Sequence, residues 1–318
     1  MFFESILKEN PVYIVDIGAS GGLHKRWKKF NQGLRAILFE PDQKEYTNLK
    51  SILSENHIII NKALSDKKGE ITFHTCRKQQ VSSVYLPNFP HLNRFPEPER
   101  FNIIETVKLD ADTLDNQLQK NNIDRVDFIK IDTQGHELSI LKGAAQSLKQ
   151  TIGLEVEVEF VQHYENQPLF VDVNNFIINF GFELFDLKRA FWKRKDVKNY
   201  CRNCKGQMVH GDALYLRSPE NILTMPDISE ISIVRAINIY LAYGCFDLAE
   251  ILSRRSYSRG IISKKINEEL NSVLQQQVDK GIIPIFWGKK KMHAILQKIT
   301  DSFSDEGKYS IGDPSLGS

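Results

Sequence analysis

The sequence predicts an α/β fold built on a mostly parallel β-sheet. Short runs of β-branched residues alternate with segments of helical period through the first part of the chain, which is typical of βα units. The first run ends in the glycine-rich segment DIGASGG (16–22), and a helix is expected to begin near Leu23. Strand signals stop near Ser218, after which the apolar spacing is helical.

Seven strands are expected, at residues 12–18, 36–40, 57–64, 126–132, 152–160, 182–187 and 212–217. Amphipathic crossover helices are expected between the earlier strands, at residues 23–30, 44–55 and 137–150. The last two strands are joined by a basic segment too short for a full crossover helix, so they are expected to pair antiparallel. The sheet would end in an antiparallel pair.

The chain is expected to form three regions: an α/β domain (1–217), a helical extension (218–302) and a disordered tail (303–318). Four of the eleven prolines lie between residues 76 and 100, which predicts a long irregular loop. The helical extension has three candidate roles: it packs on the α/β domain, it forms a homo-oligomer interface, or it covers the active site. Apolar periodicity alone does not choose among them.

Composition and charge limit the classes of partner. The formal net charge of the 318 residues is +2, which gives no reason to expect a nucleic acid. The four cysteines are too few for a disulfide framework, and the first residues do not resemble a signal peptide, so the cytoplasm is the expected compartment. The longest apolar stretch, 231–246, contains Arg235 and Asn238 and is shorter than the roughly 20 residues of a transmembrane helix. A soluble protein without a membrane segment is expected.

The turn after the first strand predicts a nucleoside site. Glycines there let a ligand approach the backbone, and Glu40 closes the second strand, where a carboxylate can accept hydrogen bonds from ribose hydroxyls. Ser20 and Leu23 stand where the dinucleotide fingerprint requires glycine. Asp16 suits a cationic or amino-acid-like group, which favours S-adenosylmethionine. The alternative is a tight turn of purely structural value beside a solvated Glu40.

These segments resemble the FkbM-type methyltransferase family. The resemblance spans residues 12–217 and rests on DIGASGG, ILFEPD, NKALSDKKGEITFH and VDFIKIDTQGHELSILKGA. It implies a class I Rossmann-like fold with a seven-stranded sheet of order 3-2-1-4-5-7-6, the last strand antiparallel. It also implies an S-adenosylmethionine-dependent enzyme that methylates a hydroxyl of a sugar, a glycan or a glycosylated metabolite. The chain departs from the family pattern at Ser20 and at Thr133-Gln134.

The predicted cofactor-binding residues come from the glycine turn, from the second strand and, by the resemblance, from the segment after the third strand. They are Asp16, Gly18, Ser20, Gly22, Glu40, Ser65 and Asp66.

Methyl transfer to a hydroxyl needs a group that removes the proton of the acceptor. Asp132 ends the fourth strand, where ligands bind in open α/β sheets, and His136 follows at the start of a helix. His163 lies just past the fifth strand. We expect Asp132, assisted by His136 or His163, to prepare the acceptor hydroxyl. It could do so as a base or as a metal ligand, or it could position the methionine amino group of the cofactor. The alternative interpretations are a capping aspartate and exposed histidines.

Glu155, Glu157 and Glu159 alternate along the fifth strand and therefore share one face of the sheet. Buried carboxylates need partners, so this face either lines the active cleft or is paired with Lys and Arg side chains. In the first case Asp132, Glu155 and Glu157 are a candidate Mg²⁺ site, because oxygen ligands suit that ion.

Two other functional classes stay open on the sequence. One is a nicotinamide-dependent sugar oxidoreductase, and the other is a non-catalytic Rossmann-like binding or scaffold module.

Overall fold

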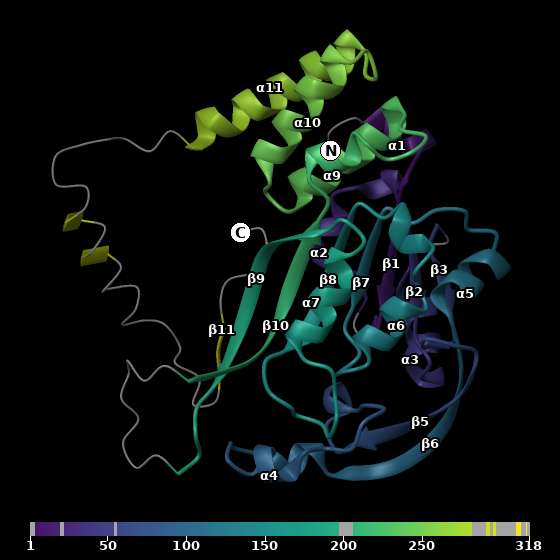
Figure 1. Cartoon of the computed structure of the whole chain (residues 1–318), viewed down its shortest axis with the longest axis vertical. Helices are drawn as coiled ribbons and strands as arrows, with labels where there is room; N and C mark the ends of the chain where they lie inside the picture. The colour runs from purple at the N-terminus through teal and green to yellow at the C-terminus, as the bar shows by residue number, and fades with distance from the viewer. Residues whose placement is uncertain are drawn as a thin grey trace.

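The main sheet of the computed structural model has the order β11-β9-β10-β8-β7-β1-β2-β3 (Figure 1). The structure describes residues 4–19, 22–53, 56–196, 206–281, 291–292, 295–296, 310–312 and 316. The strands of this sheet are β1 (Val12–Ile17), β2 (Leu34–Phe39), β3 (Ile58–Ile60), β7 (Phe128–Ile131), β8 (Gly153–Glu159), β9 (Glu183–Trp192), β10 (Gln207–Leu216) and β11 (Ser310–Gly312). Strands β3, β2, β1, β7 and β8 are parallel, and β10 pairs antiparallel with both β8 and β9. The predicted fold class, strand order and antiparallel last strand are confirmed.

A second, three-stranded sheet has the order β4-β6-β5. Its strands are β4 (Ala63–Leu64), β5 (Gly69–Cys76) and β6 (Ile103–Asp112). The single strand expected at 57–64 is therefore divided between two sheets, and the β5–β6 pair was not predicted. The segment between β5 and β6 contains only short helical turns: 3₁₀ turns at Gln79–Val81 and Pro98–Phe101 and the helix α4 (Phe89–Leu92).

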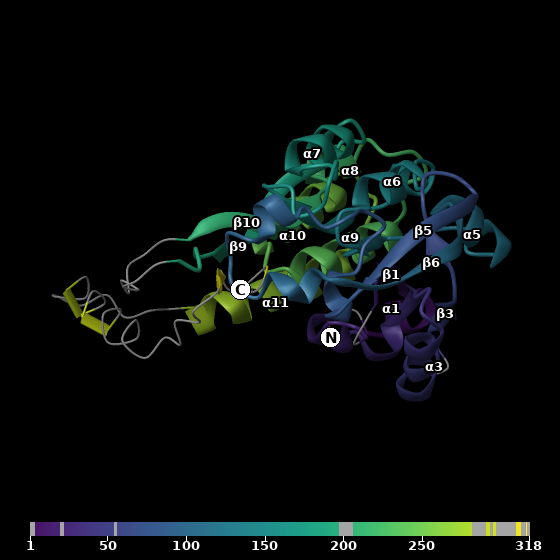
Figure 2. The ribbon, with the colours of Figure 1, turned by 90° about the horizontal axis from the view of Figure 1, so that it is seen from below.

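Helices cover both faces of the main sheet (Figure 2). One face packs against α5 (Leu114–Lys120), α6 (Glu137–Lys142) and α7 (Phe170–Ile178). The other face packs against α1 (Glu4–Glu9), α2 (Lys25–Lys28), α3 (Gln43–Ile52) and α9 (Glu230–Ala242). Further 3₁₀ turns are found at Asn31–Gly33 and Ser147–Lys149.

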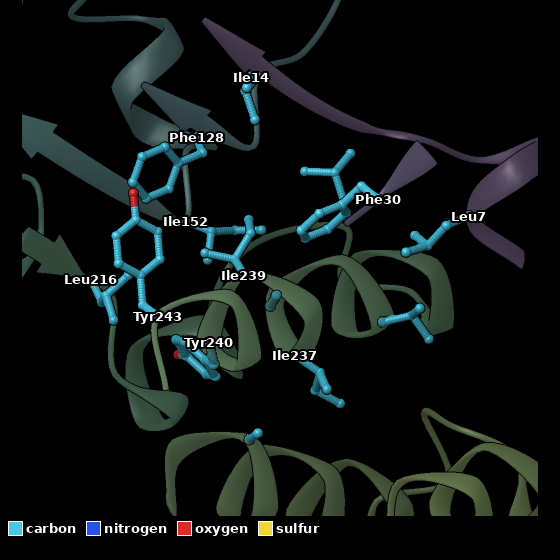
Figure 3. Close-up of a cluster of buried hydrophobic side chains, with 14 of the residues drawn as sticks. Leu7, Ile14, Phe30, Phe128, Ile152, Leu216, Ile237, Ile239, Tyr240 and Tyr243 are labelled. Carbon is cyan, nitrogen blue, oxygen red and sulfur yellow. The ribbon is translucent and has the colours of Figure 1, made fainter. Parts of the chain in front are cut away.

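The helices that follow β10 contribute directly to the core of the sheet. They are α8 (Pro219–Ile222), α9, α10 (Phe246–Ser258) and α11 (Lys264–Gly281). The Tyr243 ring, just after α9, stacks on Phe128 of β7 with centroids 5.2 Å apart, and Figure 3 shows both rings in this cluster. The Tyr240 hydroxyl donates to the carbonyl oxygen of Arg217, the residue that follows β10. Of the three roles considered for this region, packing on the sheet is the one observed.

The predicted domain boundaries stay predictions, although residues 310–312 of the predicted tail form β11 against β9. Among the described helices, none combines the length and the apolar character that crossing a bilayer requires.

Candidate active site

A cavity of about 620 Å³ opens at the carboxyl ends of β1, β2 and β7. Gly18, Glu40 and Asp132, which follow these three strands, line it. The small sheet supplies an apolar wall of Ile71, Phe73, Val107 and Leu109. Ligands of open α/β sheets bind at this edge, and the cavity volume lies in the range of small-molecule sites.

The glycine turn is fixed against the loop after β7. Gly18 has a φ of +78°, and a Cβ added there would lie 2.0 Å from the carbonyl oxygen of Asp132. Gly22 has a φ of +80°, and its N–H donates to the carbonyl oxygen of Ala19. Glycine at position 18 therefore lets the turn after β1 pack against the loop after β7, and it also lines the cavity. Ser20, the predicted cofactor residue between these glycines, lies outside the described residues.

Glu40 faces the cavity from the end of β2. Its Oε1 accepts a hydrogen bond from the N–H of Asp42 at 2.9 Å, and its own carbonyl oxygen accepts from the Asn61 amide. Burial raises the pKa of Glu40 to about 7. The carboxyl group is thus held in place at the cavity, in a position where a diol could donate to it.

Asp16 lies behind Lys130 and does not itself line the cavity. The Lys130 ammonium lies 3.6 Å from Oδ1 of Asp16 and 3.7 Å from Oδ2 of Asp132. Burial raises the pKa of Asp16 to about 6, and its Oδ1 has no hydrogen-bond partner among the described residues. Burial alone would lower the pKa of Lys130, but Asp16 and Asp132 raise it. Lys130 was not predicted as a site residue. It lines the cavity in front of Asp16 and is therefore the charged group that a ligand would meet there.

Ser65 and Asp66 are placed just outside the cavity wall. Ala63 and Leu64 of β4 line the cavity instead. The Ser65 hydroxyl donates to Oδ1 of Asp66 at 3.2 Å and lies 3.1 Å from Nε2 of His136. His136 does line the cavity, and burial lowers its pKa to about 4, so its ring is neutral at neutral pH.

A second cavity of about 400 Å³ adjoins the first and shares Gln80 and Gln134 with it. Glu157 and Glu159 of β8 line one side. Aromatic rings form another part of the lining: Phe95, Phe101, His163 and Trp192. The rings of His163 and Trp192 stack with centroids 4.5 Å apart. His163 thus belongs to this second cavity, whereas Asp132 and His136 belong to the first.

Two acids, the buried Glu157 and the partly exposed Asp132, meet at Gln134 where the two cavities adjoin. The Gln134 amide donates to Oε2 of Glu157 at 2.6 Å and to Oδ1 of Asp132 at 3.3 Å. The other Glu157 oxygen lies 3.3 Å from Nδ1 of His210. Burial, with neighbouring carboxylates, raises the pKa of both Glu157 and Glu159 well above the ordinary value. The sequence identifies Gln134 only as a departure from the family pattern. It did not predict that Gln134 links Asp132 to Glu157.

The proposed Mg²⁺ ligands do not converge. Oε2 of Glu155 accepts from the Tyr243 hydroxyl at 2.6 Å and lies 3.8 Å from the Arg26 guanidinium. No group of three His, Cys, Asp or Glu side chains with metal-binding geometry is found among the described residues. The acidic face of β8 is therefore divided: Glu155 is paired inside the fold, and Glu157 and Glu159 line the cleft.

The family model described as the methyltransferase FkbM domain matches residues 16–184, which is more than half of the chain. No curated protein matches the chain.

Two similar solved structures are methyltransferases. Precorrin-6y C5,15-methyltransferase from Geobacter metallireducens GS-15 is 11% identical, with a TM-score of 0.35 over 68% of this chain and 86% of that chain. A TehB-like SAM-dependent methyltransferase from Corynebacterium glutamicum ATCC 13032 Kitasato is also 11% identical, with a TM-score of 0.30 over 69% of this chain and 89% of that chain. The family match carries the assignment: the chain belongs to the FkbM family of S-adenosylmethionine-dependent methyltransferases.

Proposed function

We propose that this enzyme transfers the methyl group to a hydroxyl of a sugar, a glycan or a glycosylated metabolite. The observation that carries the proposal is the second cavity, which adjoins the cofactor cavity and combines buried carboxyls with an apolar, aromatic side. A sugar ring has a hydroxyl-rich edge and apolar C–H faces, so it matches both kinds of lining. Apolar walls with a few placed polar groups are typical of small-molecule sites.

The first cavity fits S-adenosylmethionine by its donors and acceptors. Glu40 would accept from the ribose hydroxyls, and Ala63 and Leu64 would lie against the adenine. Lys130 would pair with the carboxylate of the methionine moiety. Asp16 and Ser65 would act without touching the cofactor. Asp16 would orient Lys130, and Ser65 would hold the His136 ring in place. When bound, the cofactor supplies an electrophilic methyl group on its sulfonium.

Glu157 is the proposed general base. It lines the acceptor cavity, whereas Asp132 lines the cofactor cavity, and Gln134 and His210 fix its two oxygens. A raised pKa suits a base that must take a proton from a hydroxyl near neutral pH. Glu157 would take the proton of the acceptor hydroxyl while the acceptor oxygen forms its bond to the methyl carbon. The bound cofactor would supply that methyl group, and the electron pair of the broken S–C bond would remain on the sulfur of S-adenosylhomocysteine.

The test is a transfer assay with S-adenosylmethionine and a panel of glycosides, read by S-adenosylhomocysteine release and product mass. We expect O-methylated products and a fall in kcat of about 100-fold or more for Glu157→Gln, with unchanged cofactor affinity. Glu165→Gln, at an exposed position beyond β8, is the matched control. Transfer to amine or carboxyl acceptors only would overturn the proposal. An active Glu157→Gln beside an inactive Asp132→Asn would move the base to Asp132.

A further inference from the structure

Arg100 is a half-buried cation of the second cavity that forms no ion pair with a carboxylate among the described residues. Its Nε atom is buried and has no hydrogen-bond partner there. Burial lowers the pKa of Arg100, while the exposed Glu97 and Glu99 on the same turn raise it. A guanidinium removed from water without a counter-ion is unfavourable, so this position indicates a partner that the chain itself does not supply.

The Arg100 guanidinium is held in place by rings. It lies 4.7 Å from the centroid of Trp192 and 5.1 Å from that of Phe101. Trp192 is in turn stacked on His163. Contacts of this kind fix the plane of a guanidinium without satisfying its N–H donors. Arg100 is therefore positioned before any ligand arrives.

A second cation lies beside it. The N–H of Lys78 donates to the carbonyl oxygen of Arg100 at 3.0 Å, and both residues line the cavity. No ion pair of Lys78 is found in the described part of the chain. Lys188, by contrast, is compensated by Asp212 at 2.8 Å. The uncompensated positive charge thus lies on the segment between β5 and β6, while the carboxyls of the cavity lie on β8 and, paired with Lys188, on β10.

We propose that the methyl acceptor carries an oxyanion, a phosphate or a carboxylate, and that Arg100 binds it with the help of Lys78. The acceptor hydroxyl then lies at Glu157 and the oxyanion at the opposite, cationic side of the same cavity. Arginine suits this role because its paired N–H donors match the oxygens of both groups. This inference rests on the proposed function, and it narrows the substrate class from glycosides in general to anionic ones.

The experiment is calorimetric titration of the full chain, saturated with S-adenosylhomocysteine, with three kinds of probe. The probes are hexose phosphates, hexuronates and neutral methyl hexosides. We expect the anionic probes to bind about tenfold or more tightly than the neutral ones, with a preference that falls at high salt. Tighter binding of the hexose phosphates would identify phosphate as the natural group, and tighter binding of the hexuronates would identify carboxylate.

Variants separate charge recognition from packing. Arg100→Gln is expected to lose the preference for anionic probes but to keep the affinity for neutral ones, and Arg100→Lys is expected to keep part of the preference. Lys78→Gln, which leaves the ring contacts intact, is expected to reduce it. Lys108→Gln is the control, because Lys108 lies on β6 paired with Glu70 and lines neither cavity.

Equal affinity for charged and neutral probes, or no binding of any probe, would overturn the inference. An equal loss for both kinds of probe in Arg100→Gln would assign Arg100 a packing role only, which also overturns it. Methyl transfer is measured on the same probes. Arg100-dependent binding without transfer would contradict the proposed function alone, whereas transfer without charge preference would contradict this inference alone.

Discussion

The absent side chain of Gly18 makes room for the backbone of Asp132: a Cβ on Gly18 would lie 2.0 Å from the Asp132 carbonyl oxygen. The cofactor turn and the loop that carries Asp132 are therefore in direct contact. Any residue larger than glycine must separate them, and separation would disturb both sides of the first cavity at once.

Gly18→Ala is accordingly expected to lower the free energy of unfolding by about 2–5 kcal/mol, from backbone strain and overpacking together. Cofactor binding should be lost as well. Gly260→Ala is the control, because Gly260 has a φ of +69° but nothing within 4 Å of an added Cβ. Denaturant unfolding of both variants measures the difference. Equal destabilisation of the two would show that the contact with Asp132 is unimportant.

Glu40 should make the cofactor-free enzyme less stable as the pH rises. Its pKa is raised to about 7 by burial, so the folded chain retains a proton that the unfolded chain releases near its ordinary pKa of about 4.3. The stability associated with that proton is present below about pH 4 and is lost as the pH rises through about 7.

Glu40→Gln removes this penalty, so its melting temperature should rise relative to the wild type between about pH 5 and pH 8. The same variant should bind S-adenosylmethionine about tenfold more weakly, because an amide replaces the charged acceptor for the ribose. Thermal melts and calorimetry measure the two effects. Glu9→Gln, at an exposed position in α1, serves as control. A variant that binds the cofactor as the wild type does would remove Glu40 from the site.

Gln134→Glu should impair catalysis without changing the shape of the side chain. The substitution replaces the donor between Glu157 and Asp132 with a third acid, and like charges raise the pKa of one another. We expect kcat/KM for the acceptor to fall at least about tenfold, and the acid limb of its pH profile to move upward. Gln119→Glu on α5 is the exposed control. An unmoved pH profile would argue against electrostatic coupling through residue 134.

Tyr243→Phe should destabilise the fold without affecting the active site directly. The Tyr243 hydroxyl donates to Oε2 of Glu155 at 2.6 Å, and its removal leaves that oxygen to Arg26 alone. The expected loss is about 1–3 kcal/mol in the free energy of unfolding. A double-mutant cycle with Glu155→Gln isolates the pair. Tyr257→Phe, at a position 42% exposed, should change little.

The sequence was most informative where a local pattern has one structural solution. Alternation of strands and helices predicted a mostly parallel sheet, whereas the order of its strands was implied by the family resemblance. Gly18 and Glu40 do line the same cavity. Both depend on short-range rules: a strand that ends in glycine, and an acid at the end of the next strand. Such rules leave few alternatives once the sheet is parallel.

The missed elements depend on long-range pairing or on unusual backbone. Strands β5 and β6 pair across the segment that contains α4, and most of β6 is exposed or half-buried, so neither strand has the apolar run of a core strand. Gln134 contacts Glu157 from a left-handed backbone conformation, with a φ of +56°, which a glutamine in the sequence does not predict. The hydrogen bond of Glu155 could not be predicted, because its partner Tyr243 lies 88 residues away along the chain.

The family match ends at residue 184, but one face of the main sheet is covered by helices that lie beyond that residue. Phe128 and Ile152 are buried in one cluster with Ile237 and Tyr243, which follow much later in the chain (Figure 3). A recombinant fragment cut at the edge of the recognised domain would expose that apolar layer to solvent and aggregate. The methyltransferase unit that can be expressed, fused or crystallised must therefore extend beyond α9, at least through Tyr243.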